Sequence, residues 1–161
     1  MALWAHCVKA KGLRSYLLEN CTMDGMNQEE KGDEFLGNFC EKVFALHKSI
    51  RFVSAVSQKG KFLAMKKRPE VLADVSMESL EDFAHAWIFQ LLVMTAYEEV
   101  TGPLDYYLLK FRKLQGAAVP LQRDGPDRMF MMMSFDLGCD PREIIEGEIV
   151  PLVEKNSEFF M

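Results

Sequence analysis

The chain has 161 residues, of which 49% are hydrophobic, and it carries a net charge of −5. This length supports one domain of ordinary size with a substantial core, and it is short for two. The negative balance argues against a general affinity for phosphate backbones, so nucleic-acid binding would need a locally basic face. No apolar run approaches the roughly 20 residues that span a bilayer.

The first 32 residues differ in character from the rest. They hold two short semi-apolar pieces followed by the polar run MNQEEKGDE, which is typical of a linker. We expect an amino-terminal extension over 1–32, partly flexible or forming a short helix at 13–19 that docks on the domain, and a single domain over 33–161. A native start at Met23 or Met26 is an alternative that the sequence leaves open.

The next segment predicts a helix and then a hairpin. Apolar residues recur at helical spacing from Phe35 to Leu46, which indicates a helix that ends near Lys48. The β-branched and aromatic runs IRFVSAV and KFLAMKK flank the turn SQKG, which is the pattern of a β-hairpin. Arg68-Pro69 ends this hairpin, because the residue before a proline is restricted to extended backbone.

A second helix is predicted to carry two apolar stripes. Ser76 or Ser79 can cap its start, and it runs to about Val100, where Thr101-Gly102-Pro103 stops it. One stripe should pack on a sheet: Leu80, Phe83, Ala84, Trp87, Leu91 and Met94. The second stripe lies opposite, with His85 beside it: Phe89, Leu92, Val93 and Ala96. Because this helix cannot bury both stripes on its own sheet, something else must cover the second one.

Three strand-like runs follow, LDYYLLKF, LQGAAVPL and MFMMMSFDL, and the last two are separated by the turn signal Asp124-Gly125-Pro126. Asp140 then caps a last helix, with Pro141 at its first position and Glu143 reaching back. The buried stripe of this helix is predicted as Ile145, Ile149 and Leu152, and Pro151 should bend or end it. The whole order closes most simply as an α+β fold with a single five-stranded antiparallel sheet.

The run MFMMMSF allows three interpretations. A Cu(I) site would need two or three converging sulfurs, and same-face methionines of one strand start nearly 7 Å apart. An exposed, adaptable methionine surface would leave Phe130 and Met132, which face the other way, unexplained. A strand that is apolar on both faces is most simply a central strand with helices above and below it.

The element order resembles the roadblock/dynein light chain family of profilin-like domains, as do the stretches SIRFVSAVSQKGKFLA and DYYLLKFRKLQGAAVPLQRDGPDRMFMMMSF. The archaeal members of that family look closest. The resemblance spans residues 35–156 and implies the sheet order 2-1-5-4-3. It also implies homodimers or heterodimers through the second helix and third strand, and a scaffolding or regulatory role, often with small GTPases or their regulators. The extra amino-terminal segment and the bulky, aromatic second helix depart from the family.

Candidate chemistry is sparse. The histidines are His6, His47 and His85, and no arrangement with a nucleophile and an orienting carboxylate stands out. No Gly-rich phosphate loop is present. The group Lys59, Lys61, Lys66, Lys67 and Arg68 surrounds a tight turn and indicates a solvated hairpin end. His85 could make association sensitive to pH, although a plainly packed side chain is the simpler interpretation.

The four cysteines, Cys7, Cys21, Cys40 and Cys139, form no C-x-x-C pair, which favours free thiols in a reducing cytoplasm. We expect a cytoplasmic, non-enzymatic dimerisation and regulatory module without a cofactor or metal. Its interface would be formed by Phe89, Leu92, Val93, Ala96 and His85. The alternative is a small-molecule sensor of the Per-Arnt-Sim or Cache kind, with a ligand between the sheet and the helices.

Overall fold

The computed structural model describes residues 26–71, 76–122 and 128–160. The chain divides into two units, residues 1–31 and residues 32–161, and all five strands belong to the second. The helix predicted at 13–19 lies outside the described residues. None of the described helices is long and apolar enough to cross a membrane.

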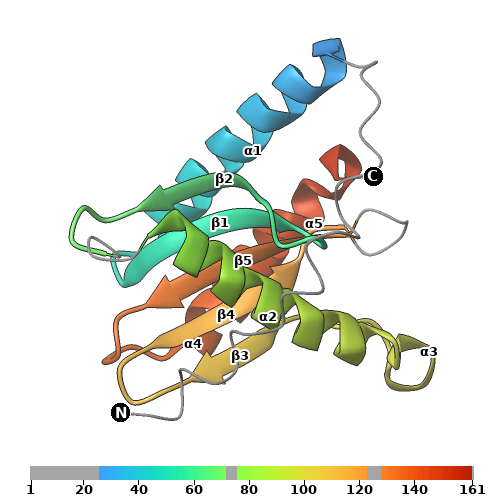
Figure 1. The fold of residues 1–161 in the computed structure, drawn as a ribbon. Coiled ribbons are helices and arrows are strands. Elements are labelled where there is room, and N and C mark those ends of the chain that lie inside the picture. Colours follow the sequence, from blue (N-terminus) through green and yellow to red (C-terminus); the bar gives the residue numbers. More distant parts are fainter. Residues whose placement is uncertain (1–25, 72–75, 123–127, 161) are drawn as a thin grey trace. The chain divides into compact units, whose positions relative to one another are not determined.

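A single five-stranded antiparallel sheet forms the centre of the second unit (Figure 1). Its strands are β1 (Ile50–Ser57), β2 (Phe62–Lys67), β3 (Tyr107–Lys110), β4 (Gln115–Pro120) and β5 (Met129–Phe135). They lie in the order β2-β1-β5-β4-β3, so the predicted fold class and strand order are confirmed. Met133 of β5 pairs with Val53 on one side and Ala117 on the other, which makes β5 the central strand.

Helix α1 spans Met26–Leu46, so the run MNQEEKGDE, predicted as a linker, is helical. That prediction was wrong because it took polarity alone as the sign of a linker. Gln, Glu and Lys are good helix formers, and the run continues without a proline into an amphipathic segment. The second half of α1 buries one face: Leu36, Phe39, Cys40 and Val43. Burial also raises the pKa of the Cys40 thiol to about 11.

The sheet is covered by helices on both faces (Figure 1). Helix α1 lies on one face with α4 (Pro141–Ile144), a π-helical turn (Ile145–Ile149) and α5 (Val150–Lys155), and α2 (Met77–Thr95) lies on the other. Met131 and Met133 of β5 belong to the core under α1, whereas Phe130 and Met132 belong to the core under α2. The two-faced central strand predicted for MFMMMSF is therefore observed.

The carboxy-terminal helix differs from its prediction in its cap and in which of its residues are buried. Asp140 does cap it, but its carboxylate accepts from the Arg142 N–H at 2.9 Å, one residue earlier than a capping box requires. A π-helical turn precedes Pro151, which cannot donate a backbone hydrogen bond. The wider turn moves the residues after it around the helix axis. As a result Val153 is buried with Ile149, while Leu152, predicted as buried, is only half-buried.

Candidate interaction surface

Helix α2 is the element on which the second apolar stripe was predicted. It begins after Ser76, whose hydroxyl accepts a hydrogen bond from the Ser79 N–H at 3.2 Å. This bond satisfies one of the backbone donors left open at a helix start. The helix ends before the predicted Val100, and a short helix, α3 (Glu98–Thr101), follows it.

The centre of the inner face of α2 is buried on the sheet. Its buried residues are Leu80, Ala84, Trp87, Ile88, Leu91 and Thr95. They share a core with Val56, Ala118, Phe130 and Met132 of the strands below. Trp87 lies over Gly116 of β4, where an added Cβ would stand 3.0 Å from the indole ring. The missing side chain at Gly116 thus admits the indole and fixes which side of α2 faces outward.

Exposed apolar side chains concentrate on α2 and α3. Seven of the eleven large hydrophobic side chains that are exposed among the described residues lie between positions 77 and 101. Phe89 is 69% exposed and Val100 is 87% exposed. Isolated apolar side chains are common on protein surfaces, so the feature that distinguishes α2 and α3 is the number of such side chains in one short segment.

The five residues predicted for an interface occupy different places. Phe89, Val93 and Ala96 are exposed on the outward side of α2 and its carboxyl end. Leu92 is half-buried, because it packs on the core beneath α2. His85 is exposed, with Nδ1 2.9 Å from the Glu81 carbonyl oxygen.

The ring of His85 lies against the turn of the first hairpin. A Cβ added to Gly60, in the connection between β1 and β2, would stand 2.5 Å from Cδ2 of His85. Gly60 also has a φ of +75°, a conformation that favours glycine. His85 therefore lies at the margin of the outward face, next to the hairpin.

Two members of the predicted inner stripe are exposed instead. Phe83 is 37% exposed and Met94 is 49% exposed, whereas Ile88, which was not assigned to that stripe, is buried. At about 100° per residue, Phe83 and Met94 share one border of the helix, beside Trp87. An ideal helical wheel places Phe83 and Met94 next to the buried residues. They are exposed nevertheless, because the sheet beneath α2 is not wide enough to cover them.

Both ends of this surface carry negative charge. Glu78, Glu81 and Asp82 are exposed near the start of α2, and Glu99 is exposed in α3. No basic side chain of the described residues forms an ion pair with any of these four. In the sequence itself, no Lys or Arg stands between positions 68 and 110.

Glu98 is engaged in a separate contact. Its Oε2 lies 3.0 Å from Nη1 of Arg128, and its Oε1 accepts from the Leu104 N–H at 3.0 Å. Arg128 precedes the central strand β5 and Leu104 precedes the edge strand β3, so this one carboxylate ties α3 to the segments that lead into both strands. Tyr97 and Val100, on either side of Glu98, are exposed.

An open recess of about 340 Å³ lies at the end of the β3–β4 hairpin, beside the start of α4; its lining is Leu108, Leu109, Lys110, Gln115, Gly116, Cys139, Asp140 and Pro141. Gln115 is buried, and its Nε2 donates to the carbonyls of Asp136 and Cys139. Its Oε1 has no hydrogen-bond partner within the described residues. The recess lies elsewhere than the pocket between sheet and helices expected of a ligand sensor.

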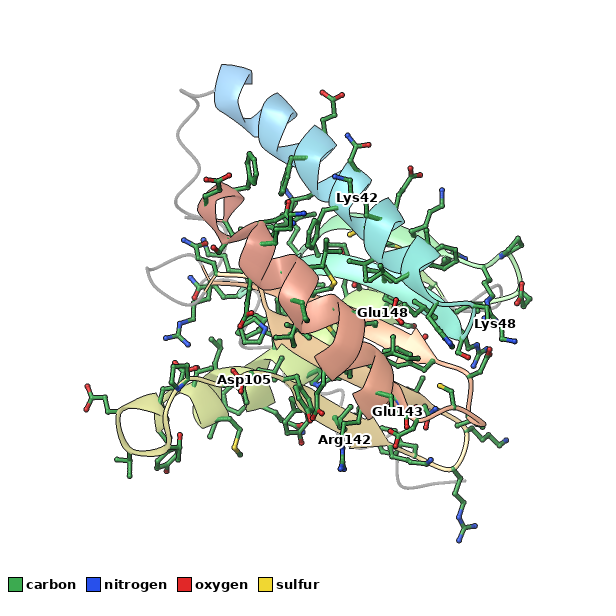
Figure 2. All side chains as sticks on the ribbon, turned by 180° about the vertical axis from the view of Figure 1, so that it is seen from behind. Lys42, Lys48, Asp105, Arg142, Glu143 and Glu148 are labelled. Carbon is green, nitrogen blue, oxygen red and sulfur yellow. The ribbon has the colours of Figure 1, made fainter. Side chains whose placement is uncertain are left out.

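The opposite face of the sheet carries charges of both signs. Figure 2 shows Lys42 on α1 and Lys48 just after it, together with Arg142, Glu143 and Glu148 on α4 and the π-helical turn. All five side chains are exposed. At the open end of the hairpin, Lys66 pairs with Glu41 at 2.7 Å and Arg68 pairs with Asp136 at 3.0 Å. Lys67 pairs with Phe52 near the start of β1, so this end lies away from the turn that carries Lys59 and Lys61. The basic group predicted around one tight turn is therefore divided between the two ends of the hairpin.

In the ranges that the structure describes, no group of three or more His, Cys, Asp or Glu side chains could hold a metal ion. No protein-family model matches the sequence, and no curated protein matches it either.

Comparison with solved structures gives a consistent fold. MglB from Myxococcus xanthus superposes with a TM-score of 0.59 at 10% identity, covering 78% of this chain and 94% of that one. The chain has a roadblock/LC7 fold. A Roadblock/LC7 domain from Streptomyces avermitilis matches with a TM-score of 0.57 at 9% identity, over 77% of this chain and 96% of that one. An MglB with a tetrameric arrangement matches at 0.57 and 14% identity, over 86% and 93%. At these identities the roadblock/LC7 likeness establishes a fold and not a function.

Proposed function

We propose that this protein is a non-enzymatic scaffold or regulatory module that associates with other molecules through the outward face of α2. The observation that carries the proposal is the exposure of Phe89 and Val93 on the outward side of a helix whose opposite side is buried on its own sheet. A partner that covers these side chains gains roughly 25 cal/mol of binding free energy for each Å² of apolar surface that it removes from water.

The roadblock/LC7 fold supports an assembly of this kind. One solved neighbour is described as an MglB with a tetrameric arrangement. For this chain we propose a homodimer in which the α2 helices of two copies pack against each other. The family resemblance adds a small GTPase or its regulator as a possible class of protein partner, and the free thiols of Cys40 and Cys139 suit a reducing cytoplasm.

Sedimentation equilibrium tests the surface. The wild-type protein should sediment as a dimer at micromolar concentration, and Val93→Asp should shift it to the monomer, because an unpaired carboxylate would be buried at the contact. Leu137→Asp is the matched control, since Leu137 is 45% exposed, close to the 41% of Val93, but lies in the loop before α4. A Val93→Asp protein that stayed as dimeric as the control would contradict the proposal.

The class of partner needs a separate measurement. Wild-type and Val93→Asp proteins should be used as baits in the same cell lysate, with recovered small GTPases identified by mass spectrometry. Recovery with the wild type alone is the expected result. Equal recovery with both baits would indicate that the GTPase binds to another surface than α2.

The alternative function, a small-molecule sensor, has less support. Its ligand would lie between the sheet and the helices, whereas the recess beside Gln115 opens at the end of the sheet. Native mass spectrometry of the purified protein would reveal a retained ligand, and such a ligand would favour the sensor.

A further inference from the structure

The recess at the end of the β3–β4 hairpin has one wall on the side of the sheet opposite α2 (Figure 2). Ala117 of β4 belongs to the core under α1, whereas Ala118 belongs to the core under α2. Because side chains alternate along a strand, Gln115 lies on the same side as Ala117. Leu108 and Lys110 of β3 are the direct partners of Ala117 and Gln115, so their side chains point to that side as well.

This wall is apolar where the helices leave the sheet uncovered. Leu108 is 37% exposed, whereas its partner Ala117 is fully buried. Leu109 and Pro141 add to the apolar lining. The volume of about 340 Å³ is close to the lower limit of ligand pockets, which run from about 300 to 1,000 Å³. The recess therefore suits a small ligand with one apolar group.

Gln115 supplies a buried acceptor. Its Nε2 donates to the Cys139 carbonyl oxygen at 3.1 Å and also to the Asp136 carbonyl oxygen. Because carbonyl oxygens can only accept, these two bonds fix the orientation of the amide. Oε1 therefore cannot exchange places with Nε2, and it has no partner among the described residues. An unpaired buried oxygen costs folding free energy, which a ligand that donates to it would recover.

Two charged side chains of opposite sign also line the recess. Lys110 and Asp140 are both exposed. None of the ion pairs in the described part of the chain engages Lys110. Oδ1 of Asp140 accepts from the Arg142 N–H, and its negative charge is otherwise free to attract a cation. Lys110 stands directly opposite Gln115, and its flexible side chain can move aside to admit a donor to Oε1.

We propose that the recess binds a small zwitterion, namely an apolar α-amino acid. Its ammonium group has three donors, which serve Gln115 Oε1 and the Asp140 carboxylate. Its carboxylate pairs with Lys110, and its apolar side chain lies on Leu108 and Pro141. The site is separate from the outward face of α2, so it does not depend on the proposed function.

L-Leucine and two of its analogues test these contacts one at a time. Isocaproate lacks the ammonium group of leucine and isoamylamine lacks the carboxylate, while both keep the apolar side chain. Each is titrated into the isotopically labelled protein, and binding is followed by the NMR signals of the Gln115 side-chain amide and the Leu108 methyl groups. An open recess exchanges a small ligand quickly, so the ligand is added rather than sought in the purified protein.

Leucine should shift these signals in a saturable way. Isocaproate should bind roughly tenfold more weakly, because it leaves the buried Oε1 without a donor. Isoamylamine should bind about threefold more weakly, a smaller loss because Lys110 is exposed to solvent. Lys110→Ala should weaken leucine by the same factor and leave isoamylamine unchanged. The matched control is Lys113→Ala, which should change neither, since Lys113 is exposed in the same hairpin but does not line the recess.

Three results would overturn the inference. The first is the lack of a saturable shift with leucine up to about 10 mM, which would leave water as the occupant of the recess. The second is isocaproate binding as tightly as leucine. The third is an equal loss of leucine binding in Lys110→Ala and Lys113→Ala, which would indicate a general attraction to positive charge. None of these results changes the sedimentation of Val93→Asp, so the proposed function is tested separately.

Discussion

The contact between Trp87 and Gly116 fixes the orientation of α2, so replacing this glycine should disturb the helix that carries the surface. A Cβ at position 116 would lie 2.6 Å from the Met133 backbone oxygen and 3.0 Å from the Trp87 ring. The backbone oxygen cannot rotate away, because Met133 belongs to the central strand β5. We expect Gly116→Ala to cost about 1–3 kcal/mol, the usual range for overpacking a close-packed core.

Thermal unfolding followed by near-ultraviolet circular dichroism measures this cost. A chain of this size loses about 3 °C of melting temperature per kcal/mol, so the midpoint should fall by roughly 3–9 °C. The control is Gly37→Ala in α1, where an added Cβ meets no atom within 4 Å and alanine should stabilise the helix by about 0.5–1 kcal/mol. A Gly116→Ala protein that melted within a degree of the wild type would refute the close approach of β4 to Trp87 and β5.

Three further predictions concern stability. Ser76→Ala should cost about 1 kcal/mol in urea unfolding, because it removes the hydroxyl that caps α2. Gln115→Leu should cost about 1–2 kcal/mol in the same assay, since the loop carbonyls of Asp136 and Cys139 lose their amide donor. The pKa of Cys40, raised to about 11 from 9.0, implies stability that is complete below pH 9 and lost as the pH rises towards 11, because only the unfolded chain then releases the thiol proton. Cys40→Ala should flatten that decline, and an unchanged slope would contradict the burial of this thiol.

Much of the sheet could be predicted from local pattern. The hairpin follows from β-branched and aromatic runs around a glycine-containing turn, and β5 from an apolar run that leaves neither face polar. The cap at Ser76 and the uncovered apolar side of α2 were likewise predictable, because cap chemistry and helical period are properties of a few adjacent residues. The polar start of α1 was missed, since a run of good helix formers looks the same as a linker when judged by polarity alone.

The sequence by itself determined the order of the elements, the two-faced central strand and the excess of apolar surface on α2. Tertiary structure alone decided which residues make up that surface. Phe83 and Met94 are exposed because the sheet beneath α2 covers only the centre of its inner face, and His85 lies at the margin because its ring meets the first hairpin. The π-helical turn before Pro151 likewise changed which side of the last helix is buried. The physical reason is the same in all three cases. The helical period gives the angular position of each side chain around the helix axis, whereas only the neighbouring elements determine how much of the helix surface is buried.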